Sequence, residues 1–141
     1  MKGKICTTVG LIGSFVASWF GGWDAGLATL VVFMAIDYTS GLVVAGVFHN
    51  SKKTANGTLE SLAGWKGLCR KGMTLLFVLI GHRLDLAIGT TYIRDAVVIG
   101  FIANELISIV ENAGLMGIPL PPVISQAIEV LTHKSEVDKL E

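Results

Sequence analysis

Charged residues are scarce in this 141-residue chain, at 16% of the total, whereas hydrophobic residues make up 52%. Soluble domains usually carry about 25% charged residues. A soluble core of this length could not take up so much apolar surface, which indicates a membrane protein. The formal net charge is zero, so the charge balance indicates no nucleic-acid partner.

The sequence also lacks the usual signs of a disulfide framework, a metal centre or an enzyme. Its two cysteines, Cys6 and Cys69, have no metal-binding spacing. Its histidines, at positions 49, 82 and 133, are scattered and form no ligand cluster. His82 and Asp85 share a helical face, but no nucleophile or phosphate-binding loop accompanies them. We therefore expect no catalytic residues, no metal and no cofactor.

Four apolar stretches are present, at about residues 5–20, 26–48, 73–90 and 93–113. About 20 residues, at about 1.5 Å each, cross a hydrocarbon core about 30 Å thick. The second and fourth stretches reach that length, whereas the first and third need local thinning, snorkelling or packing partners. The sequence predicts an all-α integral membrane protein with three or four transmembrane helices, in a single membrane domain over residues 1–141.

The polar segment between the second and third stretches, residues 49–72, is basic, and the positive-inside rule places it in the cytoplasm. Its basic residues, which we expect at the membrane surface, are Lys52, Lys53, Lys66, Arg70 and Lys71. Lys2 and Lys4 place the N-terminus on the same side. Because the N-terminus and residues 49–72 both lie in the cytoplasm, an even number of crossings must separate them, and the first two apolar stretches provide two. The third and fourth stretches provide two more and return the C-terminus to the cytoplasm. This predicts four spans, although three remain if the first stretch lies on the surface.

Two shorter segments have amphipathic patterns. Residues 59–71 carry Leu62, Trp65 and Cys69 on one helical face, which suits either a helix on an anionic leaflet or a solvated loop. Prolines and glycines end the fourth stretch. Residues 119–141 then form a predicted cytoplasmic helix and tail. In this region, residues 123–133 form the short amphipathic helix, with Ile124, Ile128 and Leu131 on one side, and residues 134–141 a frayed tail.

Ionisable side chains lie near the middle of three apolar stretches: Asp37 in the second, His82 and Arg83 in the third, and Glu105 in the fourth. Each central charge costs about 2.5–3.5 kcal/mol on insertion scales, so these groups must face one another or water. Two interpretations follow. Asp37, Arg83, Asp85 and Glu105 either form ion pairs that lock the bundle or line a water-filled lumen.

The fourth stretch carries a polar stripe on one helical face, formed by Asn104, Glu105, Ser108, Glu111 and Asn112. A helix that faces lipid needs no such stripe. The stripe therefore predicts polar faces that meet in a homo-oligomer. The full set of candidate pore-lining or intramembrane polar residues is Asp37, His82, Arg83, Asp85, Asn104, Glu105, Ser108, Glu111 and Asn112.

Small residues recur every four positions in the first stretch, as Gly10, Ser14, Ser18 and Gly22. This spacing lets helix backbones approach closely, so we expect a helix-packing surface. Gly41 continues from Asp37 at the same spacing in the second stretch. The alternative is that glycine is simply common in membrane helices.

Four segments, in order, resemble the toxin secretion/phage lysis holin family. They are FGGWD at residues 20–24, DYTSG at 37–41, SLAGWKGL at 61–68 and IANELISIVENAG at 102–114, the last followed by GIP at 117–119. The second is similar to the family's DYxTG-like element, the third to its SxxGxxG loop, and the fourth to its IANExxSIxEN motif.

The resemblance covers roughly residues 21–131. It implies a phage-encoded holin in the host bacterial cytoplasmic membrane, which contacts lipid and self-associates. Its lesions would release an endolysin, which need not be bound, or a toxin as in clostridial relatives. One alternative is a small ion channel or transporter that uses the midplane charges. Another is a membrane scaffold whose basic loop and C-terminal helix bind a partner.

Overall fold

The computed structural model describes residues 1–138 as five α-helices, with no strand in that range. The helices are α1 (Lys2–Trp19), α2 (Ala25–Gly46), α3 (Ser61–Ile88), α4 (Ile93–Leu115) and α5 (Pro122–Asp138). The all-α prediction is confirmed for the described residues. By length and composition, α2 is the one helix among them that qualifies as a candidate membrane span.

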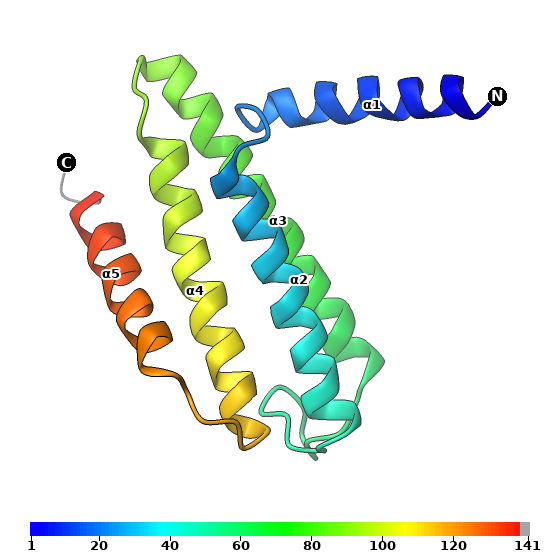
Figure 1. Ribbon diagram of the computed structural model, residues 1–141, viewed down its shortest axis with the longest axis vertical. Helices are drawn as coiled ribbons and strands as arrows, with labels where there is room; N and C mark the ends of the chain where they lie inside the picture. The colour runs from blue at the N-terminus through cyan, green and yellow to red at the C-terminus, as the bar shows by residue number, and fades with distance from the viewer. Residues whose placement is uncertain (139–141) are drawn as a thin grey trace.

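Helix α4 is the centre of the bundle, because it packs against α2, α3 and α5 (Figure 1). Figure 1 shows α2, α3 and α4 running alternately down and up, and α5 running back beside α4. The buried apolar core comes from three helices. Its members are Leu27, Leu30 and Met34 of α2, Val78 of α3, and Val98 and Ile102 of α4.

The corner between α3 and α4 is fixed by a glycine and by one carboxylate. Gly89 ends α3 with a left-handed φ of 81°, which glycine adopts without steric cost. The Asp85 carboxylate then accepts hydrogen bonds, each 3.0 Å long, from the backbone N–H groups of Ile93 and Arg94. These N–H groups have no partner within α4, so Asp85 caps the helix. Asp85 thus stabilises a chain reversal, and it forms no ion pair with the side chains of residues 1–137.

Helix α3 begins 12 residues before the apolar stretch at 73–90, and it includes residues 61–71 of the segment for which the sequence left open a surface helix or a solvated loop. The helical alternative is therefore correct for these residues. Tyr38 on α2 contacts this part of α3. Its hydroxyl lies 3.4 Å from where a β-carbon on Gly64 would be, and its ring lies 3.6 Å from that position on Gly67. This contact supports helical backbone in a segment that hydropathy alone assigns to a loop. The basic segment is therefore a loop only up to residue 60.

Helix α1 lies apart from the bundle and points away from it (Figure 1). None of its residues is buried, and a β-carbon on Gly10 would meet nothing within 4 Å. Gly22 lies outside the helix, in the turn that follows, with a φ of 95°. The small-residue stripe of α1 therefore has no partner within the described chain. Its contact with another copy stays a prediction.

Helix α5 is longer than expected, because α4 provides it with a surface to pack on. Leu131 packs against the core cluster, and the Ser135 hydroxyl lies 3.3 Å from the position of a β-carbon on Gly100. Residues 134–138, expected in a frayed tail, are helical. The remainder of that tail, residues 139–141, lies outside the described residues.

We predict that Leu30→Ala will destabilise the bundle more than Val32→Ala on the same helix. Leu30 is 0% exposed and Val32 is 52% exposed. Removing a buried leucine leaves a cavity and should lower the free energy of unfolding by about 2–3 kcal/mol. Unfolding in mixed detergent micelles, followed by circular dichroism, measures the change. Equal effects of the two substitutions would contradict this core.

Candidate functional site

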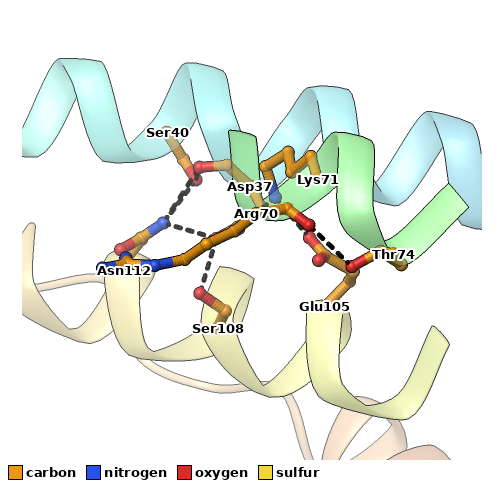
Figure 2. Close-up of polar contacts among 8 residues, drawn as sticks. All are labelled: Asp37, Ser40, Arg70, Lys71, Thr74, Glu105, Ser108 and Asn112. Atoms are coloured by element: carbon orange, nitrogen blue, oxygen red, sulfur yellow. Dashed lines mark hydrogen bonds and ion pairs between the residues drawn. The ribbon is translucent and has the colours of Figure 1, made fainter. Parts of the chain in front are cut away.

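A group of polar side chains meets in the middle of the bundle, around Asp37 of α2 (Figure 2). The carboxylate of Asp37 is buried and accepts hydrogen bonds from the Ser108 hydroxyl, at 2.6 Å, and from the Asn112 amide, at 3.2 Å. The same amide donates to the Asp37 carbonyl and to the Ser40 hydroxyl. Two residues of α4 therefore hold the polar groups of α2 in place.

The third helix contributes a cation to this group. The Lys71 ammonium lies 2.6 Å from one oxygen of Asp37 and 2.6 Å from one oxygen of Glu105. The side chains of the lysine and the two acids are 14%, 7% and 7% exposed, so this is a buried ion triad. We call the whole group the mid-bundle cluster. Its members are Asp37, Ser40, Lys71, Glu105, Ser108 and Asn112.

The two carboxylates lie at the same level of the bundle. Asp37 is 12 residues after Ala25, the first residue of α2, and Glu105 is 12 residues after Ile93, the first residue of α4. Each is therefore about 18 Å along its helix, near the middle. The polar face of α4 meets α2 and α3 within one chain at this level.

A cavity of about 230 Å³ lies beside the mid-bundle cluster. Its lining includes Asp37 and Glu105 of the cluster and Ser51 and Thr54 of the loop after α2. Arg70 is also part of its wall. The cavity thus connects the buried carboxylates with the end of the bundle that carries the basic loop.

A second charged group stabilises the opposite end of the bundle, around Arg94. Its guanidinium lies 2.7 Å from Asp24 and 3.1 Å from Asp95. It also donates hydrogen bonds to the backbone carbonyls of Phe20 and Gly22. The hydrogen bond from Arg94 lowers the pKa of the Asp24 carboxyl below its usual range. Arg94 therefore fastens the connection between α1 and α2 to the start of α4.

The chain also matches known proteins along most of its length. Residues 14–133 match the model of the bacteriophage holin family. The chain belongs to this family. It is 38% identical to the uncharacterised Listeria monocytogenes protein Lmo0128, over 90% of this chain and 86% of the relative. It is 29% identical to a probable holin of Bacillus phage phi105, over 78% of this chain and 76% of the relative. No solved structure matches it.

The family match confirms the resemblance found in the sequence. Membership in the bacteriophage holin family indicates a membrane-associated protein with a holin role in phage lysis. The family is not enzymatic in general. We therefore interpret the buried ionic groups of this holin-family chain as contacts that hold the helices together within the membrane.

The sequence placed His82 and Arg83 at the same membrane depth as Asp37 and Glu105, but the structure places them nearer to the end of α3. Arg83 is exposed and only five residues from Ile88, the end of α3, about 8 Å along the axis. His82 lines a second cavity there, of about 440 Å³, with Ser18 and Trp19. The difference arises because α3 begins at residue 61, which moves the middle of the helix away from His82 and Arg83.

The other candidate residues divide between the surface and the bundle interior. Asn104 and Glu111 of the α4 stripe are exposed, as are Lys52, Lys53, Lys66 and Arg70. Gly41 faces α4, since a β-carbon on it would lie 3.8 Å from the Asn112 amide. Lys71, expected at the membrane surface, instead lies between two carboxylates.

Sequence reasoning missed the roles of Lys71, Arg94 and Asp24. One signal for Lys71 was available: it directly precedes an apolar run, so its long stem can carry the ammonium along the helix into the bundle. No signal links Arg94 with Asp24, because 70 residues separate them.

We predict that Lys71→Met will strongly destabilise this holin-family chain, because it leaves two buried carboxylates without their cation. The expected loss in the free energy of unfolding is about 3–5 kcal/mol. Unfolding in mixed micelles measures it, with the exposed Lys66→Met as the control. Adding Asp37→Asn and Glu105→Gln to Lys71→Met should restore much of the loss. A Lys71→Met protein as stable as the Lys66→Met control would rule out a structural triad.

Proposed function

We propose that this chain is a holin that oligomerises in the host bacterial cytoplasmic membrane and opens holes through which an endolysin, or a toxin, passes. The observation that carries the proposal is the mid-bundle cluster, located halfway along the candidate membrane span in a member of the holin family. Buried charges at that level keep a small bundle intact in lipid while its outer surfaces remain free for assembly.

The proposed topology has four spans, α1 to α4, with the basic loop after α2 in the cytoplasm. The exposed Lys52, Lys53 and Lys66 at one end of the bundle support it. Helix α1 carries no charge from residue 5 to its end and is apolar on all sides, which is typical of a membrane span. To lie alongside the bundle, α1 would have to turn about the connection at residues 20–22, which would release the hydrogen bonds from Arg94 to the Phe20 and Gly22 carbonyls.

In the proposed mechanism, subunits associate through α1. Its stripe of Gly10, Ser14 and Ser18 has no partner in its own chain, and small residues let helices of different subunits approach closely. The α4 residues Ser108 and Asn112 are already satisfied within the bundle. Assembly therefore starts from α1, and each subunit keeps its own charge cluster.

A small ion channel or transporter is the second candidate function. The cavity that reaches Asp37 and Glu105 from the basic end of the bundle favours it, because intramembrane carboxylates can bind or pass cations. The two functions differ in cargo size: a holin releases folded protein, whereas a channel or transporter passes only ions or small solutes.

We predict that the purified chain releases both a small dye and a folded protein from liposomes. Ser14→Leu, which fills the α1 stripe, should slow release about 10-fold, corresponding to about 1.4 kcal/mol of lost association. Thr8→Leu, about 120° away around the same exposed helix, is the matched control and should leave release unchanged. Release of dye without protein would favour the channel, and no release at all would reject both functions.

The native Cys6 provides a test of the topology. In a Cys69→Ser background, a membrane-impermeant maleimide should not label Cys6 of α1 in intact spheroplasts before lysis, since Cys6 is proposed to lie at the cytoplasmic end of α1. Cys6 is exposed, so it should react after permeabilisation. Labelling is measured by a mass shift on gels. Reaction of Cys6 in intact spheroplasts would show that α1 does not cross the membrane, which leaves three spans.

A further inference from the structure

Helix α5 has two distinct faces. Its inner face packs toward α4 and is formed by Ile124, Ala127, Ile128, Leu131 and Ser135. Its outer face is exposed and mostly polar, and is formed by Gln126, Glu129, Val130, His133, Glu136 and Val137. The two sets follow helical spacing, so α5 is amphipathic along its described length.

The packing places α5 beside the candidate membrane span. Leu131 packs against the core that contains Leu27 and Leu30 of α2, and α2 is the candidate span. Ser135 lies against Gly100, in the first third of α4. Figure 1 shows α5 running back beside α4, so it shares the depth of the bundle. If α2 and α4 cross the membrane, α5 lies at the depth of the hydrocarbon.

The outer face of α5 cannot remain in contact with lipid at that depth. Charged side chains inside a membrane face protein or water, because hydrocarbon offers them no hydrogen bonds. Within residues 1–137, no ion pair or side-chain hydrogen bond connects Glu129, His133 or Glu136 to the rest of the bundle. These residues therefore need water.

The polar stripe of α4 is not an equivalent surface. Glu105, Ser108 and Asn112 are directed toward α2 and α3, where Lys71 and Asp37 satisfy them. Only Asn104 and Glu111 of that stripe are exposed. Within the described residues, α5 offers the more continuous polar surface at the level of the bundle.

We propose that the outer face of α5 lines the aqueous lumen of the hole, with α4 behind it and the other helices toward lipid. This inference rests on the proposed function and identifies the element that contacts water and cargo. Residues Glu129, His133 and Glu136 would face the lumen from each subunit. The sequence had favoured the α4 stripe for this role and had placed α5 in the cytoplasm.

Cysteine accessibility tests the proposal. In a Cys6→Ser/Cys69→Ser background, single cysteines are introduced as Glu129→Cys and His133→Cys. Lys66→Cys serves as a cytoplasmic control, and Val32→Cys, exposed on α2, as a lipid-facing control. A charged, membrane-impermeant thiosulfonate is applied to right-side-out and inside-out vesicles before and after opening, while release of a folded protein is followed in parallel.

The α5 cysteines should react at least 10-fold faster after opening than before it, in both vesicle orientations. Lys66→Cys should react in inside-out vesicles at all times, and Val32→Cys at none. Fast reaction of both α5 positions in unopened inside-out vesicles would place α5 in the cytoplasm and overturn the inference. Opening without reaction at Glu129→Cys and His133→Cys would also overturn it, while leaving the holin function intact. Failure of the parent protein to release cargo would instead reject the proposed function, and the inference with it.

Discussion

The Lys71 ammonium, held between Asp37 and Glu105, is the interaction on which the arrangement of this bundle depends. It joins three helices at one level, and both of its contacts are 2.6 Å long. A buried charge is tolerated only beside an opposite one, so the triad permits only those rotations of α2, α3 and α4 that bring all three groups together. The hydrogen bonds from Ser108 and Asn112 to Asp37 require the same rotation of α4.

This internal satisfaction of charge determines which surfaces remain for other contacts. Most of the polar groups of α4 form their contacts inside the bundle, so the surfaces left for lipid or for other copies lie on the helices at its margins. Helix α1 is apolar and lies apart, whereas α5 is polar on its outer face and packed on α4. A hole-forming protein needs both kinds of surface, one for neighbouring subunits or lipid and one for water.

The two ends of the bundle are stabilised by different means. At the end where α3 meets α4, Asp85 caps a helix and Arg94 binds carbonyls of the preceding connection. At the other end, Lys53 and Arg70 border a cavity that leads to the buried carboxylates. The end with the Asp85 and Arg94 contacts is closed by backbone hydrogen bonds. The polar cavity lies toward the basic end, so water would reach the mid-bundle cluster from that end.

Composition and hydropathy determined that this protein is helical and membrane-associated, and four short motifs carried its resemblance to holins. The positions of α2 and α4 also followed from the sequence, because a continuous apolar run is a local property. The sequence showed that Asp37 and Glu105 needed partners, since charges in hydrocarbon are costly. One of its two interpretations paired them with Arg83, which the structure instead places exposed near the end of α3.

Only the tertiary structure decided the pairing. Lys71 lies 34 residues from each of its carboxylates, and that distance along the chain says nothing about where a flexible side chain ends. The contacts of Tyr38 with Gly64 and Gly67, and of α5 with α4, also join segments that lie far apart in the sequence. Local pattern selects which segments are helical and apolar. Which polar groups meet depends on how the helices rotate and align, and this is set by contacts between segments distant in sequence.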